Sequence, residues 1–111
     1  MHKEYPEEYF MYKPITENPL AIDFSSVKSL DDLHGLLKEK FGFPEYYGKN
    51  LDALWDCIGD VFIWGEEKEW TIELYGVFSI REELQKEMAG ILKIFQNVHA
   101  ESPKVKFIIK S

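Results

Sequence analysis

Two aspartates, Asp52 and Asp56, are the residues of this 111-residue chain whose type and spacing could do chemistry. They are four positions apart, so on a helix their carboxylates project from the same side, about one turn from each other. Such a pair could serve as general acid and base, bind a divalent cation together with Asp60, or contact a cationic partner. It could also be an ordinary solvated acidic face.

The residues around the pair argue against catalysis and against a metal site. Two carboxylates on one short helix lack a pocket that would separate their pKa values, and no nucleophile or phosphate-binding loop accompanies them. A spacing of four residues is not that of a calcium loop. The three histidines are scattered, and His34 is expected to be a partly buried structural residue. We therefore predict no enzyme, with no catalytic residue, no cofactor and no metal.

Aromatic and turn-forming residues surround the two acids in the run PEYYGKNLDALWDC. Asn50 suits a helix N-cap, and Gly48 suits a turn with positive φ. Trp55 borders both the apolar stripe and the acidic face, so it is a core residue, a partner contact or both. Of Tyr46 and Tyr47, one is expected to pack inward while the other is exposed. Aromatic anchors beside unpaired charges are typical of a protein interface.

The composition fits one acidic globular domain. The chain is 45% hydrophobic, and Asp plus Glu outnumber Lys plus Arg by 20 to 13, which gives a net charge of -7. This charge repels phosphate backbones and attracts basic partners, so no direct nucleic-acid binding is expected. Cys57 is the only cysteine, and we expect a buried thiol. Without a signal-peptide pattern or an apolar run of membrane-spanning length, we expect a cytoplasmic protein that makes no membrane contact and is monomeric when free.

Three short apolar runs predict the strands. Residues 20–24 and 105–109 are compact apolar runs, and residues 70–75 alternate in a sequence rich in aromatic and β-branched side chains. Strands separated by helical connections pair in parallel through right-handed crossovers. The sequence thus predicts an α/β fold in which a small three-stranded parallel sheet is packed by about three to four helices. We expect residues 1–18 to be an N-terminal extension that docks through its aromatic side chains, and residues 19–111 to be the domain.

Capping residues indicate the limits of the helices. Ser29 opens a capping box before the first helix, and Gly42 ends that helix. The second helix is expected over about residues 51–58, with Gly59 as its C-cap. The third is expected to begin after Ser79 and to continue almost to the last strand.

The run that holds the two acids, together with SLDDLHGLLKEKFGF before it, resembles the barstar family of intracellular ribonuclease inhibitors. The specific match covers residues 29–57. The resemblance implies that the second helix and its preceding loop plug the active site of a basic, guanyl-specific microbial ribonuclease of the extracellular type. It also implies that the carboxylate of Asp56 takes the place of a substrate phosphate. The residues that match the family's binding motif are Tyr46, Gly48, Asn50, Asp52, Trp55 and Asp56, and Gly59 lies in the helix-end region beside them.

The chain departs from the family pattern at three places. The family's acid on the last helix aligns with Asn97, and the first 18 residues have no counterpart. The segment after Cys57 differs too, so an aromatic contact there falls to Phe62, to Trp64 or to neither. We predict a bacterial ribonuclease inhibitor or immunity protein. The alternative is a barstar-like module that binds a different basic protein or toxin.

Overall fold

The computed structural model describes residues 4–64 and 68–111, and its strands form a parallel sheet. The strands are β1 (Leu20–Asp23), β2 (Trp70–Tyr75) and β3 (Val105–Ile109). The helices are α1 (Leu30–Phe41), α2 (Leu51–Phe62) and α3 (Gln85–Glu101), with short 3₁₀ turns η1 (Glu7–Phe10), η2 (Val77–Ser79) and η3 (Glu82–Leu84). Strand order is β1-β2-β3, with both neighbouring pairs parallel. The predicted α/β fold with a small three-stranded parallel sheet is confirmed.

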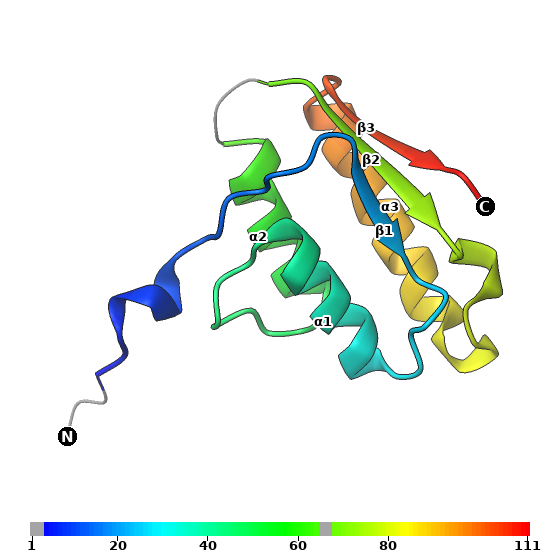
Figure 1. The fold of residues 1–111 in the computed structure, drawn as a ribbon, viewed down its shortest axis with the longest axis horizontal. Helices are drawn as coiled ribbons and strands as arrows, with labels where there is room; N and C mark the ends of the chain where they lie inside the picture. The colour runs from blue at the N-terminus through cyan, green and yellow to red at the C-terminus, as the bar shows by residue number, and fades with distance from the viewer. Residues whose placement is uncertain (1–3, 65–67) are drawn as a thin grey trace.

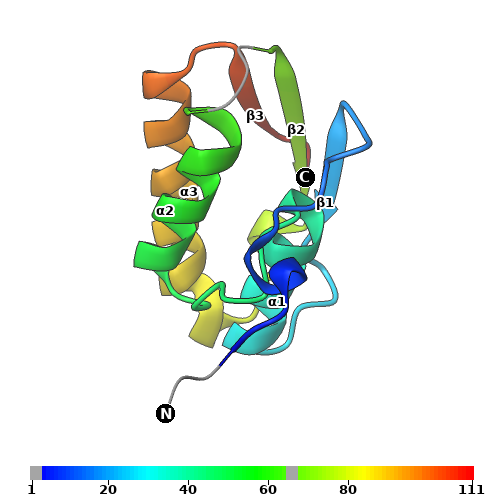
Figure 2. The ribbon, with the colours of Figure 1, turned by 90° about the vertical axis from the view of Figure 1, so that its left-hand side faces the viewer.

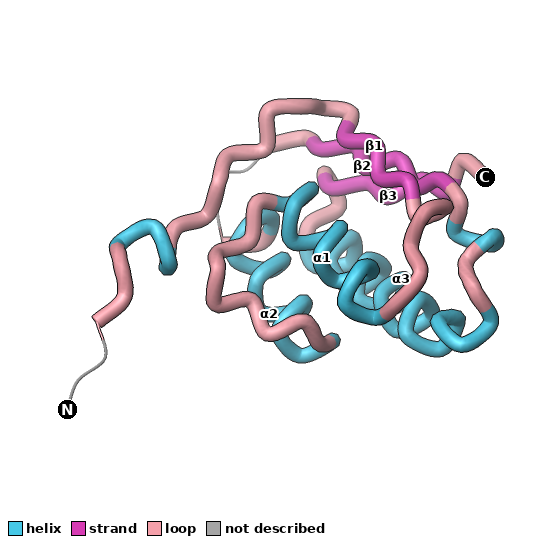
Figure 3. Tube along the Cα trace, turned by 60° about the horizontal axis from the view of Figure 1, so that its bottom comes forward, coloured by secondary structure: helices cyan, strands magenta, loops and turns pink. Residues whose placement is uncertain are grey.

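The helices cover one face of the sheet. Figure 3 shows the strands as one layer and α1, α2 and α3 as a second layer against it, and Figure 2 shows the same separation from the side. Since the strands lie side by side in chain order and the helices lie on one face, both crossovers return across this face. Leu20 and Ile22 of β1 and Ile72 and Leu74 of β2 point toward the helices and are buried.

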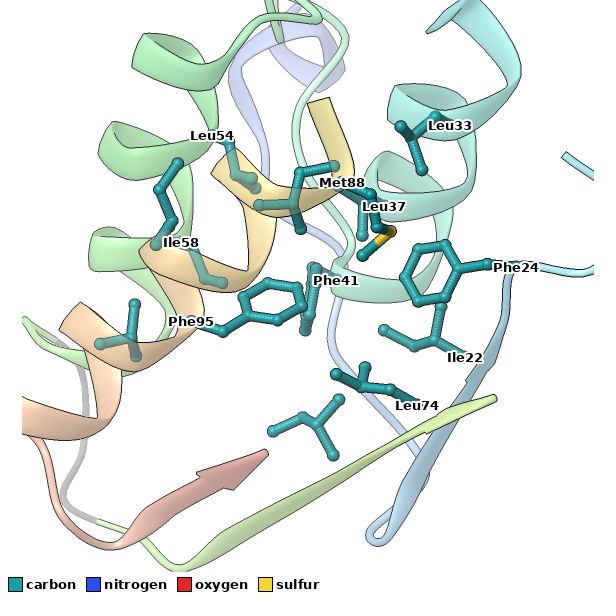
Figure 4. Close-up of a cluster of buried hydrophobic side chains, with 14 of the residues drawn as sticks. Ile22, Phe24, Leu33, Leu37, Phe41, Leu54, Ile58, Leu74, Met88 and Phe95 are labelled. Atoms are coloured by element: carbon teal, nitrogen blue, oxygen red, sulfur yellow. The ribbon is translucent and has the colours of Figure 1, made fainter. Parts of the chain in front are cut away.

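The hydrophobic core lies between the two layers (Figure 4). Leu54 and Ile58 of α2 are fully buried there, close to Phe41 of α1 and Phe95 of α3. Burial of one such side chain contributes about 1.5–3 kcal/mol, so these positions fix which side of α2 faces inward. The opposite side of α2 is left to solvent (Figure 1).

Helix α2 is about one turn longer than predicted, so Gly59 lies inside the helix and is not its C-cap. Ile63 is the C-cap residue, and its backbone N–H donates to the carbonyl oxygen of Gly59 at 2.8 Å. Phe62 is buried in the core, so the extra turn buries an aromatic ring that an end at Ile58 would have left outside. As a result Asp56 lies in the middle of the helix rather than near its end.

The chain before α3 also differs from the prediction. Ser79 does not begin the helix; it ends η2, and α3 begins at Gln85 after a second 3₁₀ turn. Ile80, between the two turns, has extended backbone and a buried side chain. Within α3, a Cβ on Gly90 would lie 2.6 Å from Cδ1 of Leu51, so the missing side chain lets α2 and α3 approach closely.

Candidate functional site

The loop between α1 and α2 leads directly into the acidic helix. Asn50 caps α2, as predicted, by accepting a hydrogen bond from the backbone N–H of Ala53 at 2.8 Å. The prediction for Gly48 is wrong, because the positive φ of 52° belongs to Lys49. The Lys49 ammonium group lies 2.8 Å from Oδ1 of Asp31 on α1. This ion pair holds the turn in a conformation that a lysine rarely adopts.

Tyr46 and Tyr47 point in opposite directions, as predicted. Tyr46 is 42% exposed, whereas Tyr47 is buried. The Tyr47 hydroxyl lies 2.7 Å from Nδ1 of His34, and Nε2 of His34 lies 2.6 Å from Oε2 of Glu87 on α3. Burial raises the pKa of Tyr47 above its ordinary value. His34 is completely buried rather than partly buried, and its two contacts tie the loop to α1 and α3.

The outer face of α2 carries the predicted acids. Asp52 and Asp56 are exposed, on the side of the helix away from Leu54 and Ile58. Trp55 is 37% exposed, so it belongs to the surface and not to the core. The outer face of α2 thus carries a ring between two carboxylates, and the exposed Tyr46 lies in the loop that leads into this helix.

A surface cavity of about 460 Å³ lies beside Asp56. Its lining is acidic and aromatic, and consists of Trp55, Asp56, Gly59, Asp60, Ile63, Trp64 and Glu101. Gly59 is buried beneath the Trp64 indole, since a Cβ at this position would lie 3.6 Å from Nε1 of Trp64. Carboxylates beside indole rings suit a lysine or arginine side chain, because the acids supply charge and the rings supply a cation–π face.

Two residues that line this cavity, Trp64 and Glu101, bear on the departures from the family pattern. Trp64 is 79% exposed and Phe62 is buried, so Trp64 is the aromatic residue that the segment after Cys57 presents. Glu101 was not predicted at all. It follows Asn97 by four residues on α3, so the spacing places the two on one side of the helix but does not reveal the cavity beside α2.

The N-terminal extension reaches the same region. The Tyr12 hydroxyl donates a hydrogen bond to Oδ2 of Asp60 at 2.6 Å. Burial, with this bond and one to Tyr46, raises the pKa of Tyr12 above its ordinary value. The Lys13 backbone N–H donates to the carbonyl oxygen of Gly42 at 2.8 Å. The extension is therefore attached to both the loop and α2.

The remaining sequence predictions concern thiol, metal and membrane chemistry. Cys57 is buried as predicted, and burial raises the pKa of its thiol. Within residues 4–64 and 68–111, no three histidine, cysteine, aspartate or glutamate residues are grouped so that they could hold a metal ion. None of the helices in this part of the chain has the length and apolar character that crossing a bilayer requires.

Comparison with known proteins agrees with this fold. The family model described as Barstar (barnase inhibitor) matches residues 18–111, which is most of the chain. The chain therefore belongs to the barstar family. It is similar to a protein of Bacillus subtilis (strain 168) named "Putative ribonuclease inhibitor YrdF", with 51% identity over 39 residues. That match spans 35% of this chain and 43% of the relative, less than half of either.

Proposed function

We propose that this protein inhibits a basic, guanyl-specific microbial ribonuclease of the extracellular type by occupying its active site. The observation that carries the proposal is the outer face of α2, where Asp52 and Asp56 are exposed beside the ring of Trp55. A ribonuclease must hold cationic groups around a phosphate, so its active site is complementary to carboxylates on a projecting helix. Membership of the barstar family supports this assignment.

Asp56 takes the place of the substrate phosphate in this proposal. It lies in the middle of α2 and at the rim of the acidic cavity, where cationic side chains of a partner can surround it. Asp52, one turn earlier, adds to the negative field that draws a basic protein to this face. Such steering raises association rate constants to about 10⁸–10⁹ M⁻¹s⁻¹ at low salt. Inhibition is competitive occlusion, without a covalent step or a cofactor.

The neighbouring residues complete the contact surface. Tyr46 and Trp55 supply aromatic anchors, which are the side chains most enriched among energetically important interface residues. Asn50 and Gly48 set the shape of the loop, because the Asn50 side chain caps α2 and also donates to the carbonyl oxygen of Gly48 at 3.2 Å. Gly59 leaves room for an indole ring beside the cavity.

The acidic cavity accepts one lysine or arginine side chain of the ribonuclease in the same complex. Asp56 and Glu101 line it from two different helices, so a cation placed there meets carboxylates on both sides. Glu101 thereby supplies an anion on α3 where Asn97 has none. The cytoplasm of a bacterium that secretes the nuclease is where an acidic inhibitor of this kind would protect cellular RNA.

The test is RNA cleavage by a guanyl-specific microbial ribonuclease in the presence of increasing amounts of the protein. We expect activity to fall in proportion to added protein until about one equivalent is present, and we expect no RNA cleavage by the protein alone. Full nuclease activity at micromolar protein would refute the proposal. If the nuclease stays fully active and the protein instead binds a different basic toxin, the alternative of a barstar-like module for another partner is supported.

A further inference from the structure

The N-terminal extension adds an aromatic cluster to the proposed contact surface. This segment precedes the part of the chain that matches the family, and η1 projects from the domain beside the α1–α2 loop (Figures 1 and 3). The ring centroids of Tyr9 and Phe10 are each 6.1 Å from that of Tyr46, and 5.0 Å from each other. Tyr5 stacks on Tyr9 at 4.3 Å. The cluster is therefore continuous with a residue of the proposed site.

Hydrogen bonds hold the base of this cluster against the domain. Immediately after it, Tyr12 donates to Asp60 on α2 and Lys13 donates to Gly42 at the end of α1. A segment fixed at its base loses less conformational entropy on binding than a free chain terminus. The rings of η1 are thus presented in a defined position beside the α1–α2 loop.

The extension enlarges the site and does not cover it. Tyr46 and Trp55 stay exposed in its presence. Phe10 is itself 56% exposed, and Met11 next to it is also exposed. Apolar side chains that gather at the surface in this way are typical of a contact region for another protein.

The charge of the extension has the same sign as that of α2. The exposed acids of residues 4–11 are Glu4, Glu7 and Glu8. A basic protein that approaches Asp52 and Asp56 is attracted by these glutamates as well, whereas a second copy of this acidic chain is repelled by them. Charge thus favours a basic partner over self-association.

We infer that residues 4–11 form a second contact region for the same ribonuclease. The rings of Tyr9 and Phe10 pack on the nuclease surface beside its active site, and the three glutamates face basic residues there. The inference rests on the proposed function, because the partner is the same.

Two variants with matched controls test the inference by titration calorimetry and stopped-flow association with a guanyl-specific microbial ribonuclease. Phe10→Ala is expected to weaken binding about tenfold or more. Its control is Phe78→Ala, which removes a ring that is 77% exposed on η2, at the opposite end of the molecule from η1 (Figure 1). This control is expected to change the Kd less than twofold.

The second variant removes charge without removing rings. Replacing Glu7 and Glu8 by Gln is expected to slow association about threefold at low salt, with the difference fading at high salt. The matched control replaces Glu82 and Glu83 of η3 by Gln and is expected to have a smaller effect on the rate.

Three results would overturn the inference. If Phe10→Ala binds as tightly as the wild type while Asp56→Ala binds more weakly, the second contact region is absent and the proposed function stands. If the wild type itself does not bind, both proposals fail. If the wild type sediments as a dimer and Phe10→Ala as a monomer, the rings serve a second copy of this chain instead.

Discussion

The Tyr12 hydroxyl donates a hydrogen bond to Oδ2 of Asp60, and this 2.6 Å contact joins the N-terminal extension to the last turn of α2. Asp60 follows Asp56 by four residues, so their carboxylates repel each other across one helical turn. A hydroxyl donor on Asp60 offsets part of that repulsion. The same bond therefore positions the extension and stabilises an acidic cavity that can accept a cation.

Ionisation of Tyr12 is expected at unusually high pH. Its folded-state pKa is raised above the ordinary 10.0, so the protonated phenol stabilises the folded protein below about pH 10. This contribution is lost as pH rises through the raised pKa. In a spectrophotometric titration of phenolate absorbance, Tyr12 and Tyr47 should ionise late among the six tyrosines. Tyr12→Phe should remove one late phenol; an unchanged late amplitude would contradict the hydrogen bond to Asp60.

Replacing Tyr47 by Phe is expected to destabilise the fold. The change leaves Nδ1 of the completely buried His34 without its hydrogen-bond partner, which costs about 1–3 kcal/mol. Urea unfolding measures the loss. The matched control is Tyr75→Phe, because the Tyr75 hydroxyl makes only a long 3.4 Å contact with Glu73 of the same strand. If the free energy of unfolding falls equally in the two variants, the hydrogen bond between Tyr47 and His34 does not contribute the stability assigned to it.

Replacing two glycines by alanine, one inside α1 and one at its C-cap, should change the stability of the fold in opposite directions. At Gly42 the φ of 70° is unfavourable for alanine by about 1–2 kcal/mol, and the new Cβ would lie 2.1 Å from the carbonyl oxygen of Lys13. Gly35 lies inside α1, and nothing beyond its chain neighbours and the backbone of the same helix lies within 4 Å of its Cβ position, so alanine there should stabilise by about 0.5–1 kcal/mol. Denaturant unfolding of Gly42→Ala and Gly35→Ala measures the change in the free energy of unfolding for each variant. A stabilised Gly42→Ala would contradict the close contact between Gly42 and the backbone of Lys13.

Local signals explain what the sequence predicted well. The caps at Ser29 and Asn50 act through hydrogen bonds to N–H groups three residues later, so short sequence windows contain them completely. Two strands follow from compact apolar runs and the third from alternation, and the outward face of α2 follows from the spacing of Leu54 and Ile58. The sequence alone therefore suffices to place Asp52 and Asp56 at the surface.

The errors have a tertiary origin. Gly59 lies inside α2 because the helix continues far enough to bury Phe62 in the core, and no local pattern reveals that burial. Lys49 takes the positive φ expected for Gly48 while its side chain pairs with Asp31, 18 residues earlier in the chain. The position of Glu101 beside the cavity depends on how closely α2 and α3 pack. Such arrangements depend on the whole fold and not on neighbouring residues.

The acidic cavity leads to a prediction for Glu101. Glu101→Gln should weaken binding of a guanyl-specific microbial ribonuclease about tenfold, because a cation in the cavity loses one of the carboxylates around it. Stability should not change, since this side chain is exposed. Calorimetric titration measures the Kd, and Glu82→Gln on η3 is the control. An identical Kd for Glu101→Gln and wild type would mean that the cavity stays empty in the complex.

Asp56 gives the most direct test of the central claim, which is that its carboxylate replaces a substrate phosphate. The measurement is the inhibition constant against a guanyl-specific microbial ribonuclease for wild type, Asp56→Ala and the exposed control Glu82→Ala. Loss of one partner of a buried charge pair costs about 2–5 kcal/mol, so Asp56→Ala should inhibit roughly 30- to 4,000-fold more weakly. Glu82→Ala should match the wild type. Equal inhibition by Asp56→Ala and wild type would contradict the account.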